Sequence, residues 1–287
     1  MSDLKNTWEH KYVTTNGVKL HYVTQGTGPL MLMLHGFPEF WYSWRHQIPV
    51  FAENFQVVAL DLRGYNDSEK PKAQSAYIMD EFIKDVAGVI KGLGQEKCVL
   101  VGHDWGGAIA WCFAYAHPEM LEKLIILNLP HPAKFSQGLA TPQQLLRSWY
   151  MFLFQLPFIP ELLLQAFDYQ TIAQTIQGTA VNKNAFTSSD LDAYKNAAAK
   201  PGALTAMLNY YRNVFSHFLP NQNWGILNVP TLMIWGENDT ALGKELTYGT
   251  DAYVSNLQIQ YIPNCGHWVQ QEEPQLVNRY IRDFLVV

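Results

Sequence analysis

The stretch VGHDWGG, residues 101–107, joins an apolar run to a helical one and decides the fold of this chain. Its pattern of glycine, any residue, nucleophile, any residue and glycine is typical of a sharp turn between a strand and a helix. Side chains larger than those at 102 and 106 would collide in such a turn, and the start of the following helix favours a carboxylate at Asp104. The stretch therefore predicts a nucleophile at Asp104, although alone it also fits a structural turn with Asp104 as helix N-cap.

Apolar runs on both sides of this turn predict the rest of a sheet. PLMLMLHG (29–36), FQVVALDL (55–62), the run that leads into Asp104 and LEKLIILNLP (121–130) are apolar enough for strands buried on both faces. Over residues 77–94, apolar side chains recur every three or four positions and a glycine ends the pattern, which predicts a helix. Alternating strands and helices predict an α/β fold with a doubly wound, mostly parallel sheet.

The strand pattern stops in the middle of the chain and resumes later. From about residue 133 to about 219 only helical segments are recognisable, whereas VPTLMIWG (229–236) and LQIQYIP (257–263) again predict strands. We therefore expect an α/β core with an inserted helical cap. The core is predicted over residues 1–132 and 220–287, and the cap over residues 133–219.

Composition narrows the class of protein. The chain has 287 residues, 48% of them hydrophobic and 16% charged, which is typical of a globular protein. A net charge of −5 argues against a nucleic-acid partner. The most apolar stretch, 150–167, is interrupted by polar residues and prolines, so we expect no membrane partner. Three cysteines that form no CxxC motif suit a reducing cytoplasm. The oligomeric state, monomer or dimer, stays open.

Further segments place reactive side chains after predicted strands. LHGFP (34–38) ends an early strand, WGEND (235–239) follows a later one, and NCGHW (264–268) follows the last. Open α/β sheets place their sites at the C-terminal ends of strands. α/β-Hydrolases also carry their catalytic triad in this order along the chain, with the nucleophile first, then the acid and then the histidine. We therefore expect a catalytic triad of Asp104, Asp239 and His267.

The same segments nominate the surroundings of the triad. Glu237 lies two residues before Asp239 and is the alternative acid. In this arrangement the oxyanion hole uses the backbone N–H of the residue after the nucleophile and one from the loop of the early strand, which nominates Trp105 and Phe37. We expect His103 to pack and form hydrogen bonds beside the turn. No histidine falls in a metal-ligand pattern, so we expect neither a metal nor an organic cofactor.

An aspartate nucleophile implies a particular chemistry. Asp104 is ionised at neutral pH and can attack an sp³ carbon directly, displacing a leaving group and forming an alkyl ester of the enzyme. His267 would then remove a proton from the water that attacks the ester carbonyl. Epoxides and alkyl halides both fit. An alkoxide leaving group needs a proton donor such as tyrosine, whereas a halide needs only weak N–H or cationic donors.

Several motifs together resemble the soluble epoxide hydrolases of the α/β-hydrolase superfamily. The resemblance extends from the first strands almost to the C-terminus and implies the α/β-hydrolase fold with a helical cap. It also implies conversion of small apolar epoxides and water to vicinal diols. Relatives of the first three motifs occur in haloalkane and haloacetate dehalogenases. The motifs are HGFPEFWYSWR (35–45), DLRGYNDSEKP (61–71), VGHDWGG (101–107), WGENDTAL (235–242) and GHW (266–268).

The cap separates these alternatives. SWYMFLFQLP (148–157) and NYYR (209–212) resemble the segments in which epoxide hydrolases carry two ring-opening tyrosines, and the resemblance places these at Tyr150 and Tyr211. Haloacetate dehalogenases have a histidine where Tyr150 stands, and arginines where this chain has Trp105 and Ala108. The alternative is aromatic packing, with Tyr210 as a near competitor of Tyr211.

The aromatic residues around these motifs predict an apolar pocket suited to a hydrophobic epoxide. A dehalogenase of the same fold is the alternative function, and a non-enzymatic receptor with this fold is a third hypothesis. Besides Phe37 and Trp105, the expected pocket residues are Trp41, Phe152, Phe154 and Trp268.

Overall fold

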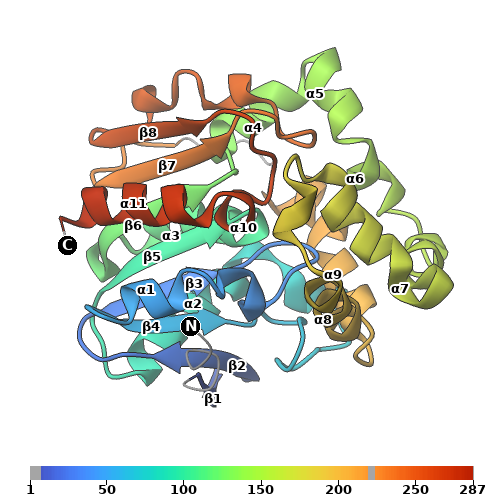
Figure 1. Cartoon of the computed structure of the whole chain (residues 1–287), viewed down its shortest axis with the longest axis horizontal. Coiled ribbons are helices and arrows are strands. Elements are labelled where there is room, and N and C mark those ends of the chain that lie inside the picture. The colour runs from blue at the N-terminus through green and yellow to red at the C-terminus, as the bar shows by residue number, and fades with distance from the viewer. Residues whose placement is uncertain (1–7, 219–223, 287) are drawn as a thin grey trace.

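The computed structural model describes residues 8–218 and 224–286, which form one sheet covered by helices (Figure 1). The strand order is β1-β2-β4-β3-β5-β6-β7-β8. β1–β2 and β2–β4 pair antiparallel, and every later pair is parallel. The predicted mostly parallel, doubly wound sheet is therefore confirmed. The strands are β1 (Glu9–Thr15), β2 (Val18–Gln25), β3 (Leu30–Leu34), β4 (Gln56–Leu60), β5 (Cys98–His103), β6 (Leu121–Leu127), β7 (Thr231–Gly236) and β8 (Leu257–Ile262).

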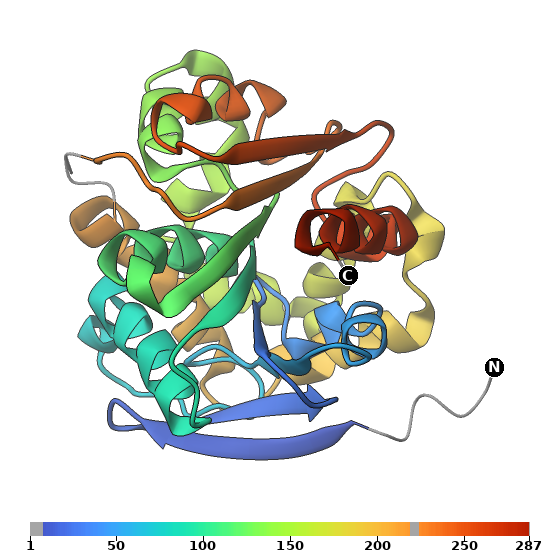
Figure 2. The same cartoon turned by 90° about the vertical axis from the view of Figure 1, so that its left-hand side faces the viewer.

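Helices cover both faces of the parallel part of the sheet. In Figure 2, α2 and α3 lie on one face, and α1 and α11 lie on the other. Every residue of β3, β5 and β7 is buried, which explains why these strands are apolar throughout instead of alternating. The edge strand β1 is largely exposed and carries charged side chains. The helices are α1 (Ile48–Phe51), α2 (Met79–Gly92), α3 (Trp105–Ala116), α10 (Val269–Glu272) and α11 (Pro274–Leu285).

The chain between β6 and β7 forms the group of helices on the right of Figure 1. Its described residues contribute no strand to the sheet. The predicted start of the cap at residue 133 falls inside the first of these helices. The predicted end at 219 and 220 lies outside the described residues, so the domain limits stay a prediction. The helices are α4 (Pro132–Leu139), α5 (Pro142–Arg147), α6 (Trp149–Leu153), α7 (Ile159–Thr179, interrupted at 166–169), α8 (Ser188–Ala198) and α9 (Ala203–Arg212).

Short helical turns complete the described fold. They are η2 (Trp41–Trp44), η3 (Gln74–Tyr77), η4 (Pro118–Met120), η5 (Lys183–Ala185), η6 (Val214–Phe218), η7 (Lys244–Thr247) and η8 (Thr250–Ala252). Within 8–218 and 224–286, none of the helices has the length and apolar character that crossing a bilayer would require.

The turn between β5 and α3 is a tight junction between the sheet and a helix. Asp104 has φ of 49° and ψ of −123°, a backbone conformation that is costly for a residue with a side chain. A Cβ on Gly106 would lie 2.2 Å from the Leu34 carbonyl oxygen, and one on Gly102 would lie 2.4 Å from the Gly106 carbonyl oxygen. Glycines at 102 and 106 thus let α3 start directly against β3 and β5.

Gly106→Ala should destabilise the fold, because the new methyl group meets backbone atoms that cannot rotate away. We expect the free energy of unfolding, measured by urea denaturation, to fall by about 1–3 kcal/mol. Gly178→Ala is the matched control, since a Cβ there meets nothing within 4 Å. In that helical position alanine should be neutral or stabilise by up to about 1 kcal/mol. Equal effects of the two substitutions would contradict the close-approach explanation.

Candidate active site

The structure brings Asp104, Asp239 and His267 together at the C-terminal ends of their strands. Asp104 follows β5, Asp239 follows β7, and His267 follows β8. Nδ1 of His267 lies 2.6 Å from Oδ2 of Asp239, and its Nε2 lies 3.6 Å from Oδ2 of Asp104. The imidazole therefore stands between the two carboxylates, as a triad requires.

Asp239 is the carboxylate that the fold holds in place. Its Oδ1 accepts the N–H groups of Ala241 and Leu242 at 2.8 and 3.0 Å, and its Oδ2 also accepts from Nδ2 of Asn128 at 2.8 Å. The alternative acid, Glu237, instead pairs with Lys244. Sequence reasoning missed Asn128, whose only signal was its position just after a strand.

Burial and the neighbouring charges set the protonation of the triad. Burial opposes the charged form of Asp104, but the adjacent His267 outweighs it and holds the pKa of Asp104 below its ordinary value. The pKa of Asp239 is lowered in the same way, against burial, by the charge of His267. Burial acts to lower the pKa of His267, but the two carboxylates raise it well above its ordinary value. Two anions thus share one imidazolium in the resting site.

Phe37 and Trp105 both adjoin Asp104. The backbone N–H of Phe37 donates to Oδ1 of Asp104 at 2.7 Å. Trp105 follows Asp104 directly as the first residue of α3, so its backbone belongs to the positive end of that helix. One carboxylate oxygen therefore already accepts an N–H donor from the nominated loop.

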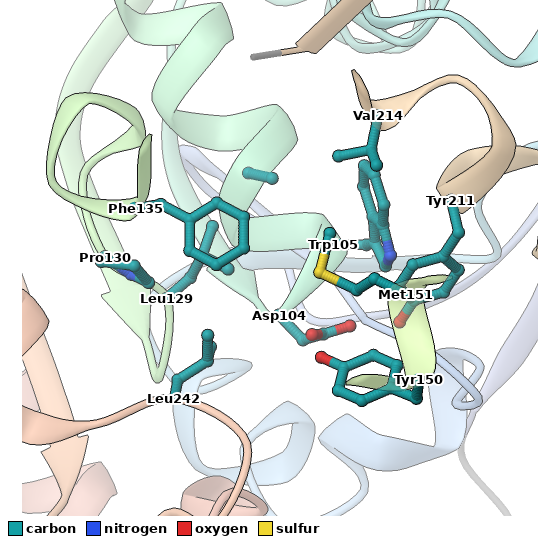
Figure 3. A pocket seen from close by; sticks show the side chains of 11 residues that line it. Asp104, Trp105, Leu129, Pro130, Phe135, Tyr150, Met151, Tyr211, Val214 and Leu242 are labelled. Carbon is teal, nitrogen blue, oxygen red and sulfur yellow. The ribbon is translucent and has the colours of Figure 1, made fainter. Parts of the chain in front are cut away.

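A cavity of about 40 Å³ lies above Asp104 between the core and the cap. Figure 3 shows the hydroxyl groups of Tyr150 and Tyr211 pointing toward the Asp104 carboxylate. The other walls are mainly apolar, and none of the described lining residues is a lysine or an arginine. The lining residues are Asp104, Trp105, Ala108, Leu129, Pro130, Phe135, Tyr150, Met151, Tyr211, Val214 and Leu242.

Both tyrosines keep their protons at neutral pH. Burial, followed by the charge of Asp104, raises the pKa of each of them well above the ordinary value. The Tyr211 hydroxyl also shares a hydrogen bond with the Trp105 side chain. Tyr210 points elsewhere, because its hydroxyl donates to the Arg63 carbonyl at 2.7 Å. Of the two adjacent tyrosines, only Tyr211 faces the cavity.

The structure corrects the expected aromatic wall. Of the six aromatic residues expected in it, only Trp105 lines the cavity, and Phe37, Trp41, Phe152, Phe154 and Trp268 do not. The Phe37 ring instead packs edge-on against Phe154 and Tyr211. Phe152 is 46% exposed and stacks on Phe215. Successive residues of a helix point about 100° apart, so α6 directs Tyr150 and Met151 inward and Phe152 outward.

The other three aromatic side chains pack behind the cavity or away from it. Phe154 lies behind the cavity against Tyr150 and Tyr211. Trp268 packs against His267 and donates through its indole N–H to Thr179. Trp41 packs against Trp8 and His10, near β1.

A buried pair, of which sequence reasoning missed Glu39, supports the backbone of His267. Nδ1 of His103 lies 2.7 Å from Oε2 of Glu39, and its Nε2 lies 2.8 Å from the His267 carbonyl oxygen. Both His103 and Glu39 are fully buried. His103 therefore packs and forms hydrogen bonds beside the turn, as expected, and Glu39 was hidden within the longer motif.

One group of side chains resembles a metal site by its composition. His21, Asp61 and Asp67 place possible ligand atoms within 4.8 Å of one another. Asp61 is already occupied: it accepts from Trp41 N–H at 2.9 Å and from Asn66 at 2.8 Å, and lies 2.6 Å from His21 Nδ1. Asp67 pairs with Lys200. These contacts tie β2 to the loop after β4, away from the cavity.

Comparison with known proteins agrees with this architecture. A family model described as alpha/beta hydrolase fold matches residues 29–274. Epoxide hydrolase 4 of Mus musculus is 43% identical over 286 residues, which cover 96% of this chain and 79% of that protein. The AB hydrolase superfamily protein YfhM of Bacillus subtilis is 42% identical over 279 residues, covering 96% of this chain and 97% of that protein.

Solved structures of epoxide hydrolases are also similar to this chain. An epoxide hydrolase from Bacillus megaterium, solved with an inhibitor, matches with a TM-score of 0.91 at 39% identity, covering 96% of this chain and 100% of that chain. Epoxide hydrolase VrEH1 from Vigna radiata matches with a TM-score of 0.85 at 27% identity, covering 99% of each chain. By sequence, fold and the arrangement of its candidate active site, the chain belongs to the epoxide hydrolase family of α/β-hydrolase-fold proteins.

Proposed function

We propose that this chain hydrolyses small apolar epoxides to vicinal diols through an alkyl ester on Asp104. The observation that carries the proposal is the pair of tyrosine hydroxyls aimed at an aspartate nucleophile inside an apolar cavity (Figure 3). Membership of the epoxide hydrolase family supports it. The substrates are the epoxide and water, and no group outside the chain is needed for the steps below.

In the first step, Asp104 attacks a ring carbon. Its Oδ1 accepts the Phe37 N–H, which leaves Oδ2 to form the new C–O bond. The ring C–O bond breaks, and its electron pair stays on the ring oxygen. Tyr150 or Tyr211 gives that oxygen a proton, which their raised pKa values keep available. The product is a hydroxyalkyl ester of Asp104.

In the second step, water hydrolyses the ester. Esterification removes the charge of Asp104, which is one of the two charges that raise the pKa of His267. The imidazolium can then give up its proton, which returns to the tyrosinate left by the first step. The neutral imidazole acts as a base toward water that attacks the ester carbonyl carbon. Negative charge develops on the carboxyl oxygen beside the N–H groups of Phe37 and Trp105. Collapse expels the diol oxygen, which takes a proton from His267. The carboxyl group of Asp104 then passes its own proton to the imidazole, which restores the resting charges of both groups.

Three features support finer parts of the proposal. The cavity lining has no lysine or arginine among the described residues, which disfavours a small carboxylate substrate such as a haloacetate beside Asp104. Cys98, Cys112 and Cys265 are buried and free, which fits a reducing cytoplasm. The helices between β6 and β7 supply both tyrosines, which fits a cap over 133–219 acting on substrate held by the core.

His267→Gln should separate the two steps. Asp104 can still attack, but no base remains for the water, so the ester should accumulate. Intact-protein mass spectrometry with styrene oxide should show an adduct of one substrate mass. A variant that forms no adduct and no diol would assign His267 an earlier role, provided that circular dichroism shows a native fold.

The charge of Asp104 should control the protonation of His267. Because that anion raises the pKa of His267, Asp104→Asn should lower it, as the ester does in the second step. An NMR titration of the His267 ring in the wild type and in Asp104→Asn measures both values. Equal pKa values in the two proteins would show that Asp239 alone sets the protonation of His267.

The tyrosine pair tests the substrate class. Tyr150→Phe and Tyr211→Phe should each slow ester formation from styrene oxide, by roughly 10²–10³ for a donor aimed at developing charge. The double variant should lose ester formation almost completely, because no acid then remains for the alkoxide. Efficient halide release from haloalkanes that survives in the double variant would instead identify a dehalogenase with two packing tyrosines.

A further inference from the structure

The loop that carries His267 needs support beyond the triad. Residues 264–268 follow β8 and lead into α10. Asp239 holds the imidazole at 2.6 Å, but that contact orients the ring and does not hold the backbone on either side. A base that is displaced by about 1 Å from its water can lose about 10² in rate. The groups that hold this backbone therefore matter for the hydrolysis step.

Glu272 holds the backbone on both sides of His267. Its Oε1 accepts the N–H of Gly266 at 3.1 Å and that of Trp268 at 3.3 Å. These are the residues immediately before and after the histidine. One carboxylate oxygen thus accepts hydrogen bonds from the residues on both sides of His267.

The other oxygen of Glu272 binds the cap segment. Its Oε2 accepts the N–H of Val181 at 2.8 Å and that of Asn182 at 3.0 Å. Val181 and Asn182 lie just after α7, about 90 residues from Glu272 in sequence. Glu272 is 3% exposed. Throughout the described chain no lysine, arginine or histidine is recorded in an ion pair with it, so its buried charge depends on these four N–H groups.

Two more features keep loop and cap together. A Cβ on Gly266 would lie 2.7 Å from Oε1 of Glu272 and 3.0 Å from the Thr179 carbonyl oxygen. Glycine at 266 therefore permits this close approach. The Trp268 indole N–H donates to Oγ1 of Thr179, the last residue of α7, at 2.9 Å. This second tie is independent of the carboxylate.

We propose that Glu272 is a positioning residue for ester hydrolysis, and that through it the cap holds the His267 loop in place. The inference rests on the proposed function. Glu272 does not line the cavity and acts only through the backbone of Gly266 and Trp268. The end of α7 is therefore part of the support of the general base.

The first step should not depend on this contact. Asp104 is held by the turn between β5 and α3, and the tyrosines are carried by α6 and α9. Glu272 has no hydrogen bond to any of these described elements. Loosening the His267 loop should therefore slow decay of the ester and leave its formation unchanged.

Glu272→Gln tests this directly. An amide NH₂ cannot accept a hydrogen bond, so either the loop pair or the cap pair of N–H groups loses its acceptor, whichever way the amide turns. Glu273→Gln is the matched control. That neighbouring side chain is only partly buried and forms no cap bond at the start of α11.

The two steps are followed in single turnovers of styrene oxide with excess enzyme, quenched and measured by intact-protein mass spectrometry. For Glu272→Gln we expect ester decay to slow by about 10-fold or more, and formation to stay within about 3-fold of the wild type. In the steady state kcat and KM should then fall together and kcat/KM should stay unchanged, because it reports steps up to the ester. A loss of folded enzyme would instead lower kcat at constant KM. Glu273→Gln should behave as wild type.

Thr179→Val provides a second variant that keeps the shape of the side chain and removes the oxygen that accepts from Trp268. It should slow ester decay selectively, which tests whether the end of α7 supports the His267 loop. If Glu272→Gln does not fold, unchanged ester decay in Thr179→Val overturns that support. The inference is overturned if decay is unchanged, if formation and decay slow equally, or if Glu273→Gln has the same effect. A failure of His267→Gln to form any ester would count against the proposed function itself.

Discussion

The backbone of Asp104 is the constraint on which the rest of the site depends. Its positive φ is costly for a residue with a side chain, and the close approach of Gly102, Gly106 and the Leu34 carbonyl keeps it there. The same turn exposes the carboxylate above the sheet and places it at the first turn of α3. The Phe37 N–H from the neighbouring strand's loop then reaches Oδ1. A local strain thus brings nucleophile, helix end and N–H donor together.

Around this turn the protein buries several carboxyl side chains, and each of them has hydrogen-bond partners. Asp239 has Asn128 and two backbone N–H groups, and Glu39 has His103, Gly36 and two glutamines. Such groups are costly to bury unless they are satisfied. These hydrogen bonds satisfy the buried carboxylates that lie around Asp104 and His267.

The cap contributes more than a cover for the cavity. Its helices α6 and α9 direct two hydroxyl groups toward Asp104. The end of α7 contacts the loop of His267 directly through Thr179, and Val181 and Asn182 reach it by way of Glu272. In the proposed mechanism, the acid of the first step and the base of the second are therefore both positioned in part by the helices between β6 and β7.

The sequence by itself determined the strands, the mostly parallel sheet and the candidates Asp104, Asp239, His267, Tyr150 and Tyr211, because these depend on local patterns at strand ends and on motifs. Only the tertiary structure decided the strand order, which side chains line the cavity and which polar groups support the triad. Phe152 was expected in the pocket and faces outward, whereas Met151 faces inward. Asn128, Glu39 and Glu272 carry no motif of their own. Their long-range contacts join segments from about 60 to more than 230 residues apart. Such pairings are set by packing, which a local pattern cannot record.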